Sequence, residues 1–476
     1  MSGLRGRSIL ILCVLAAEGL ACAQKPPSAP DHPWDSSLAQ QQLTVPSRPT
    51  STAVLDPAKV YTLSELVNIA EESNPDTRVA WQNAKARAAE LGIAKSTLYP
   101  TLAAEVLAGT TRESIFFGNS FQRQTVETFA PVLALDYIIF DFGRRSEEIS
   151  ISRNNLLAAN FQFNDTHRRV IFGVMQAYYR LLDTKGLQEA AEANLKNAQT
   201  VDQAAEARLH LGLATLPDVL EARSAAAQAD YNLQAAIGAT EIAHGDLATA
   251  LGISPTVKFQ VESIQTIKMP ESIGDTVENS IDKALGQRPD LLQRVADLRA
   301  TSAEVKEKQR DFFPTLSIDG DAGIARSYGQ QGQMPGVYSP TVNPWNAQLT
   351  LSWTLFDGLA REKRLQRAQA DQKQAAATVD SVRDQVENQV WSAYSTATTA
   401  LRQQKAAAAL LEAATESYNA ALESYNYGVR SQIDVVSAQR TLADARTADV
   451  TARTQLLTGL AALSYQTGDL LYAKTP

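Results

Sequence analysis

Apolar and polar residues alternate along two stretches in the second half of the chain. In residues 316–324 the apolar residues Leu316, Ile318, Ala322 and Ile324 share one face, and residues 349–355 repeat this pattern. Residues 133–139 alternate less cleanly, because Ala134 and Ile138 are apolar on the other face. A period of two predicts β-strands with one apolar face, and runs of about ten residues suit strands that cross a membrane. We predict four strands in all, one pair in each half.

Two much longer stretches are typical of helices. Residues 144–211 contain the glycines Gly173 and Gly186 and no proline, and residues 360–427 contain neither glycine nor proline. At 1.5 Å per residue each would extend about 100 Å. Apolar residues recur every seventh position in both, which predicts coiled-coil packing; they are Ile149, Leu156, Phe163, Val170 and Ala177, then Val379, Val386, Ala393, Ala400, Ala407 and Ala414. After a glycine turn, a second helix returns over residues 216–251 and 432–467.

Four short motifs occur twice in the same order. At a distance of 214 positions, Asn74-Pro75-Asp76 matches Arg288-Pro289-Asp290 and Tyr99-Pro100-Thr101-Leu102 matches Phe313-Pro314-Thr315-Leu316. At a distance of 216 positions, Phe140-Asp141-Phe142-Gly143 matches Phe356-Asp357-Gly358 and Gly212–Asp218 matches Gly428–Asp434. Each half also begins with a helical segment, 62–98 or 275–312, that ends before an aromatic-proline pair. We therefore predict two structural repeats, 61–251 and 275–468, joined by a connector, 252–274, and followed by a tail, 469–476.

The N-terminus resembles an export signal. Arg5 and Arg7 precede an apolar run over residues 9–17 and then small residues, which predicts a signal peptide over residues 1–23. Two processing routes remain open: cleavage before Gln24, or lipidation of Cys22. Seven prolines between residues 24 and 57 predict an extended lead-in over residues 24–60. The apolar run of the signal is too short to span a bilayer, and no other run reaches 18 apolar residues, so a membrane role would not use helices.

Composition argues against several functions. There are 44 basic and 52 acidic residues, a net charge of −8, which disfavours nucleic acid as a partner. The four histidines and two cysteines are scattered, so we expect no metal site. The common catalytic and nucleotide-binding motifs are absent from the sequence, and we expect neither an enzyme nor a cofactor.

With its two repeats, the chain resembles the TolC-like outer-membrane efflux proteins over nearly all of its mature length. The resemblance is carried by Tyr99-Pro100, Phe313-Pro314, Phe356-Asp357-Gly358 and the segment from Tyr425 to Asp434. It implies a mixed fold: a homotrimeric, 12-stranded transmembrane β-barrel with four strands per chain, continuing into a long periplasmic α-helical coiled-coil barrel. Four strands alone would leave open edges in a bilayer, so the strand pattern also calls for an oligomer. The implied partners are outer-membrane lipid, a periplasmic adaptor protein and an inner-membrane pump.

The resemblance assigns a periplasmic gate to Asp218, Tyr425, Arg430 and Asp434. Thr215-Leu-Pro-Asp218 and Ser431-Gln-Ile-Asp434 can equally be helix caps, and the two roles are compatible. A second acidic ring of the family falls on Ser437, where the acid is missing.

The resemblance assigns adaptor docking to the turns at Gly212, Leu213, Gly428 and Val429. A glycine after a helix is also expected as a left-handed cap, so both roles remain open for Gly212 and Gly428.

Two functions follow from these observations. The first is a passive exit duct of a tripartite efflux or type I secretion system, which exports small molecules or proteins across the periplasm and outer membrane. The alternative is a periplasmic coiled-coil scaffold that conducts nothing; it would not need strands with apolar outer faces. In the duct, we expect the polar loop 326–344 at the cell surface.

Overall fold

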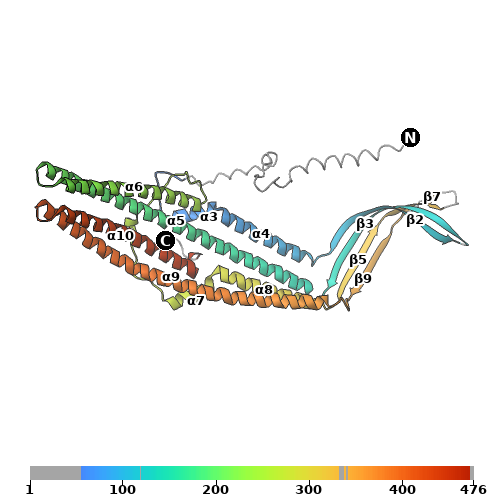
Figure 1. Cartoon of the computed structure of the whole chain (residues 1–476). Helices are drawn as coiled ribbons and strands as arrows, with labels where there is room; N and C mark the ends of the chain where they lie inside the picture. Colours follow the sequence, from blue (N-terminus) through green and yellow to red (C-terminus); the bar gives the residue numbers. More distant parts are fainter. Residues whose placement is uncertain (1–54, 118, 332–336, 339–340, 472–476) are drawn as a thin grey trace, which may run out of the picture. The chain divides into compact units, whose positions relative to one another are not determined.

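The computed structural model describes residues 55–117, 119–331, 337–338 and 341–471. The predicted signal peptide with Cys22, residues 24–54 of the lead-in and residues 472–476 of the tail lie outside the described residues. Within residues 55–471, the helices lie alongside one another and the long strands extend from one end of them (Figure 1).

Two helical hairpins dominate the structure. Helices α5 (Arg144–His210) and α9 (Ala360–Asn426) have 67 residues each, and the return helices are α6 (Leu216–Ala250) and α10 (Gln432–Thr467). These bounds confirm the predicted long helices to within a residue or two. Much of the predicted seven-residue pattern is buried, including Val386, Ala400 and Ala414 on α9.

The shorter helices differ from the prediction. The segments 62–98 and 275–312 were each predicted as one helix, which is wrong: the structure has α3 (Leu63–Ser73) and α4 (Pro75–Ser96), then α7 (Val277–Gln287) and α8 (Pro289–Arg310). The reason is proline, which has no N–H to donate within a helix but fits its first turn. Pro75 and Pro289 therefore each end one helix and begin the next.

Both of these breaks contact the end of a return helix. The Asn74 amide donates to the carbonyl of Ala250 at 3.1 Å, and the Arg288 guanidinium donates to the carbonyl of Gln466 at 3.5 Å. Gly252 and Gly468 follow these helix ends with positive φ angles of +77° and +88°. A Cβ on Gly252 would lie 2.9 Å from the carbonyl oxygen of Ser73, so the first contact leaves no room for a side chain.

Antiparallel strands form one sheet. The long hairpin of β2 (Thr101–Phe117) and β3 (Ser120–Phe140) pairs through β3 with β5 (Thr315–Gly323), which pairs with β9 (Trp345–Ser352). Farther along β3, β6 (Ala325–Gln331) takes the place of β5 and pairs with β7 (Val337–Tyr338) and β8 (Thr341–Val342).

Two details of the predicted strands are wrong. The last strand ends at Ser352, so Trp353 and Leu355 follow it rather than belong to it. The polar loop 326–344 is partly strand, because β3 is long enough to pair with β6 beyond the end of β5. Residues 332–336 and 339–340 of that loop lie outside the described residues.

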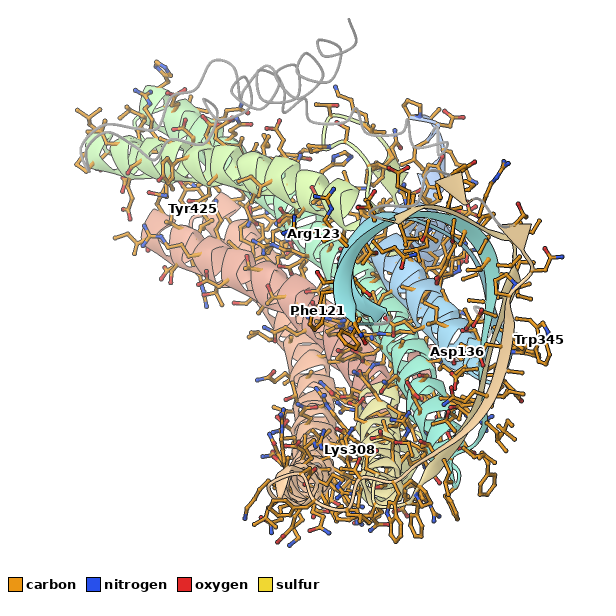
Figure 2. All side chains as sticks on the ribbon, turned by 90° about the vertical axis from the view of Figure 1, so that its right-hand side faces the viewer. Phe121, Arg123, Asp136, Lys308, Trp345 and Tyr425 are labelled. Atoms are coloured by element: carbon orange, nitrogen blue, oxygen red, sulfur yellow. The ribbon has the colours of Figure 1, made fainter. Side chains whose placement is uncertain are left out.

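The sheet is curved, and its two faces differ in polarity. Figure 2 shows Trp345 on the convex side and Asp136 on the concave side. By the strand register, Asp136 lies opposite Asp319, which lies opposite Gln348, so this concave face is polar. The convex face carries apolar side chains that are 54–77% exposed: Leu102, Val106, Leu133, Trp345, Leu349 and Leu351.

The helices form open rows. Near the sheet the order of contacts is α4–α5–α8–α9, and toward the hairpin turns it is α6–α5–α10–α9. In the part of the chain that the structure describes, β2 and β9 are the edge strands of the sheet near the helices. The helix or strand at each end of a row therefore has a neighbour on only one side among the described residues.

The largest apolar core lies where α3, the middle of α5 and the end of α6 meet the connector. Its fully buried side chains include Leu66, Val174, Leu182, Leu247 and Ile264. The short parallel strands β1 (Val60–Tyr61) and β4 (Gln260–Val261) and the 3₁₀ turns η2 (Ile264–Thr266) and η3 (Asp469–Leu471) border it. This cluster holds the first hairpin to the connector. Among the described residues, no helix is both long enough and apolar enough to cross a bilayer.

Candidate functional site

The two hairpins turn in the same way. Gly212 and Gly428 have positive φ angles of +74° and +75°. The N–H of each glycine donates to the carbonyl three residues earlier, and the N–H of Leu213 or Val429 donates to the carbonyl five residues earlier, at 2.8–2.9 Å. These bonds are those of a Schellman motif, in which glycine avoids the strain of a left-handed backbone. The predicted capping role of both glycines is confirmed, and it explains why the chain reverses at these two points.

Exposed apolar side chains surround both turns. Six of them, which we call the tip patch, are 60–79% exposed: Leu211, Leu213, Leu216, Tyr427, Val429 and Ile433. The Schellman bonds fix the backbone beneath them, so the patch is presented on a defined surface. Exposed apolar residues gathered in this way are typical of a surface that binds another protein.

The helix after each turn begins with a carboxylate cap. Asp218 accepts hydrogen bonds from the backbone N–H and hydroxyl of Thr215 at 2.8 and 2.7 Å. Asp434 accepts the same two bonds from Ser431 at 3.0 and 2.8 Å. Hydrogen bonds from Thr215 hold the pKa of Asp218 below its ordinary value, and those from Ser431 do so for Asp434, with a further contribution from the Arg430 charge. The predicted capping role of both aspartates is confirmed, and both carboxylates are charged at neutral pH.

Tyr425 is buried between the two hairpins. Its hydroxyl donates to the Oε1 atom of Gln432 at 2.5 Å, within its own hairpin. Arg208, on α5 of the other hairpin, donates from Nη1 to the Tyr425 carbonyl at 2.6 Å and lies 4.3 Å from the centre of the tyrosine ring. Burial raises the pKa of Tyr425, which therefore stays a neutral hydrogen-bond donor. We call the contact between Arg208 and Tyr425 the tip latch.

Arg430 does not pair with Asp218 among the described residues of this one chain. Its backbone N–H donates to the Ser424 carbonyl at 3.3 Å, and its charge acts on Asp434. A contact with Asp218 of a second copy stays a prediction. Ser437 is exposed on α10, one turn after Asp434.

The sequence prediction missed Arg208 and Gln432. Arg208 is a basic residue in the last turn of a helix, where such residues are expected to stabilise the helix dipole, so nothing distinguished it. Gln432 is the first residue of α10 and is buried beside Tyr425. The available signal for Gln432 was its position seven residues after Tyr425, on the other side of the glycine turn, where its side chain can reach the tyrosine hydroxyl.

A buried charge network joins the two halves away from the tips. Arg168 on α5 is 1% exposed and donates to Asp165 at 2.6 Å and to the Tyr465 carbonyl at 3.1 Å. It also pairs with Asp290 at 3.4 Å, and Arg288 pairs with the same aspartate at 2.6 Å. Burial favours the neutral form of Asp290, but the hydrogen bond and charge of Arg288, together with the charge of Arg168, lower its pKa. The network fixes α5 against the start of α8 and the end of α10.

A cavity of about 770 Å³ lies beside this region, between α3, α5 and the connector. His167 Nδ1 lies 3.4 Å from the Glu71 carboxylate at its wall, and Tyr178, Tyr179 and Met175 also line it. Burial raises the pKa of Tyr179 to about 12. Within the described ranges, no group of three or more His, Cys, Asp or Glu residues is arranged to hold a metal ion.

Known proteins share this arrangement. The family model described as outer membrane efflux protein matches residues 66–253 and 280–469, more than half of the chain. Protein CyaE of Bordetella pertussis is 27% identical over 322 residues, covering 67% of this chain and 66% of CyaE. Outer membrane protein OprJ of Pseudomonas aeruginosa is 24% identical over 413 residues, covering 86% of this chain and 84% of OprJ.

Solved structures agree in fold. The outer-membrane channel OprN is 22% identical, with a TM-score of 0.74, and the match covers 89% of this chain and 96% of OprN. The outer membrane protein VceC of Vibrio cholerae is 19% identical, with a TM-score of 0.70, and the match covers 85% of this chain and 96% of VceC. The chain therefore belongs to the outer membrane efflux protein family.

Proposed function

We propose that three copies of the chain close into one passive exit duct. The support is the open edge on each side of every row: β2 and β9 in the sheet, and α4, α6 and α9 among the helices. A strand edge with unpaired N–H and C=O groups is costly in a bilayer, so the edges must be paired. A head-to-tail ring would place β2 of one copy beside β9 of the next. The number three, and hence a 12-stranded barrel, is carried over from the family.

The difference between the two faces of the sheet is the observation that carries this proposal. The convex face exposes Leu102, Leu349 and Leu351, which would be unfavourable in water and favourable against lipid hydrocarbon. The concave face carries Asp136, Asp319 and Gln348, which suit a water-filled interior. A periplasmic scaffold that conducts nothing would need neither face.

An aromatic belt marks the boundary between strands and helices. Tyr99, Phe140, Phe313, Trp353 and Phe356 are all exposed there. Aromatic side chains are enriched at membrane–water interfaces, where their rings lie at the level of the headgroups. This supports a topology in which the belt lies at the periplasmic side of the membrane, and the helices extend into the periplasm.

Two internal repeats, 61–251 and 275–468, account for the architecture. The family model matches two segments with similar bounds. Equivalent contacts also recur: Asp141 accepts hydrogen bonds from the backbone and side chain of Arg145 after the first strand pair, and Asp357 accepts them from Arg361 after the second. We propose that a duplication produced the two hairpins and that 252–274 connects them. Cleavage before Gln24 would remove residues 1–23, including Cys22, on export. In the alternative route, Cys22 would be lipidated and kept as part of the mature chain.

The hairpin tips would form the periplasmic end of the duct. The tip patch, together with the turns at Gly212, Leu213, Gly428 and Val429, would be the surface on which a periplasmic adaptor docks. Asp218, Tyr425, Arg430 and Asp434 would form the gate, with three copies of Asp434 around the axis. Like charges in such a ring attract cations.

The duct itself would have no energy source and no catalytic role. Relatives carry different cargo names: CusC of Escherichia coli is a cation efflux system protein, and OpmQ of Pseudomonas putida is a pyoverdine export protein. We propose that in this system too an inner-membrane pump selects the cargo and the duct transmits it.

Reconstitution tests the proposal. The full chain, expressed with its export signal and purified from outer membranes, should have the mass of three chains plus detergent by light scattering and should form channels in planar bilayers. A monodisperse monomer that is soluble without detergent and does not conduct would favour the scaffold instead.

A further inference from the structure

The long β2–β3 hairpin has a regular register. Pairing runs without a bulge from Thr101 opposite Asp136 to Phe117 opposite Ser120. Because side chains alternate between faces, the even-numbered residues of β2 and the odd-numbered residues of β3 lie on the convex face along the whole hairpin. The character of that face can therefore be followed level by level, from the helices to the far end.

The convex face changes from apolar to basic along most of its length and ends in the exposed aromatic pair Phe116 and Phe121. Nearest the helices, the cross-strand pairs on this face are Leu102 and Leu135, Ala104 and Leu133, Val106 and Pro131, and Ala108 and Phe129. Beyond them come Thr110 and Glu127, Arg112 and Thr125, and Ser114 and Arg123. On the neighbouring strand β6, Arg326 lies opposite Phe129. We call Arg112, Arg123 and Arg326 the arginine band.

The arginine band lies where the hydrocarbon would end. Phe140, in the aromatic belt, and Phe129, at the other end of the apolar pairs, are eleven residues apart on β3. At about 3.3 Å per residue this is roughly 36 Å along the strand, or about 28 Å across a membrane for a strand tilted by about 40°. The apolar outer band of such barrels is about 25 Å tall. Arg326 is level with the end of this band, and Arg112 and Arg123 lie beyond it.

The three guanidinium groups are exposed and carry an excess of charge. Arg112 donates from Nε to the hydroxyl of Thr125 at 3.0 Å, and no carboxylate in the described ranges lies within ion-pair distance of the three arginines. Arg112 and Arg123 are diagonal neighbours on paired strands, where Cα atoms are about 7–8 Å apart. Glu127 shares this stretch of the face and offsets one of the three positive charges. Figure 2 shows Arg123 on the convex side of the curved hairpin.

We propose that the arginine band binds the phosphate groups of lipid headgroups in the outer half of the outer membrane. The proposal rests on the topology proposed above, in which the far end of the hairpin faces the cell exterior. Guanidinium groups bind phosphate through two parallel hydrogen bonds and are weakly hydrated, so they suit a partly dry interface. A headgroup phosphate whose acyl chains lie against Leu133 and Phe129 would fit both the charge and the apolar surface below it. The expected ligand is therefore a lipid, because both the headgroup phosphate and the acyl chains are required.

Native mass spectrometry of the intact assembly in detergent tests this binding. The probes are bisphosphorylated lipid A, phosphatidylcholine as a lipid without net charge, and inorganic phosphate. The test variant is the triple replacement Arg112→Gln, Arg123→Gln and Arg326→Gln. The matched control, Arg153→Gln, Arg180→Gln and Arg299→Gln, removes the same charge from exposed positions on α5 and α8, which lie inside the helix rows rather than at their edges.

We expect lipid A to bind the unmodified chain more tightly than either other probe. Each basic residue near an anionic membrane surface strengthens attraction about fivefold, so the test variant should lose at least tenfold in apparent affinity for lipid A. The control should change less than twofold. Unchanged lipid A binding in the test variant, or equal binding of lipid A and inorganic phosphate, would overturn the proposal. Channel conductance is measured separately. If the assembly conducts but does not bind lipid A, only the lipid site is refuted. If it does not conduct, the proposed duct is refuted.

Discussion

Removing the guanidinium of Arg208 should open the periplasmic end of the duct. The tip latch joins α5 of the first hairpin to α9 of the second, through the 2.6 Å hydrogen bond to the Tyr425 carbonyl and the ring contact at 4.3 Å. Separating the two hairpins at their tips must break both interactions. The Arg208→Ala variant removes both and leaves the Schellman turn intact, because that turn uses only the backbone of residue 208.

The size of the effect follows from these contacts. A hydrogen bond from a charged donor contributes about 1.5–3 kcal/mol, and a cation–π contact about 0.5–1 kcal/mol when exposed. Arg208 is half-buried, so we take about 2 kcal/mol for the latch in each chain. Three chains that open together would lose about 6 kcal/mol. About 5.5 kcal/mol is enough to change a two-state equilibrium from 1:99 to 99:1, so the variant should change from mostly closed to mostly open.

Single-channel conductance in planar bilayers measures this change. Arg208→Ala should raise the mean conductance more than Tyr425→Phe, because phenylalanine keeps the ring and the carbonyl and loses only the hydrogen bond to Gln432 within one hairpin. Arg223→Ala is the matched control, since it breaks an exposed ion pair with Glu206 inside the first hairpin. Wild-type conductance in Arg208→Ala, with an intact assembly, would refute the latch.

Three further predictions concern the fold, the caps and the topology. Gly252→Ala should lower the free energy of unfolding of the purified protein by about 2 kcal/mol. Gly143 also has a positive φ but has open space where a Cβ would lie, so Gly143→Ala should lower it by about half as much. Equal losses in the two variants would contradict the close contact between Gly252 and Ser73. Hydrogen bonds lower the pKa of Asp434, so its cap is complete above pH 3.8, the ordinary pKa of an aspartate, and is lost as pH falls below that value. The protection of amide protons from exchange in the first turn of α10 should therefore fall with pH in that range. The Asp434→Asn variant should not show this pH dependence. A Gln331→Cys variant should react with a membrane-impermeant maleimide on intact cells, while Leu213→Cys should not, and the reverse pattern would invert the topology.

The periodic parts of the fold could be predicted from the sequence. The seven-residue pattern and the glycine turns predicted the bounds of α5, α6, α9 and α10. Both signals depend only on residues that are close in sequence, within one helix or one turn. The caps at Thr215 and Ser431 were predictable for the same reason, since their partners lie three residues away. The strand ends were not, because β3 determines how far β6 extends, and the local sequence of 326–331 does not show it.

The tip latch and the arginine band needed the structure. Arg208 and Tyr425 are 217 positions apart, and only the packing of α5 beside the other hairpin brings them together. Arg112, Arg123 and Arg326 come from three strands, and the register decides that they share a face. A shift of one residue between β2 and β3 would place Arg112 and Arg123 on opposite faces.

The open edges of the sheet also have a consequence for folding. The β2–β3 hairpin can form from local contacts early, but the outer edges of β2 and β9 have no partner strand within the described residues, and in the proposed ring they would pair with other chains. Folding of the sheet and assembly of the subunits would then be a single event whose rate depends on the concentration of chains in the membrane. Until that event, each chain exposes two pairing-competent edges, which makes slow assembly an aggregation hazard. A cell that exports the chain faster than it can meet its copies would therefore accumulate misassembled material rather than stable monomers.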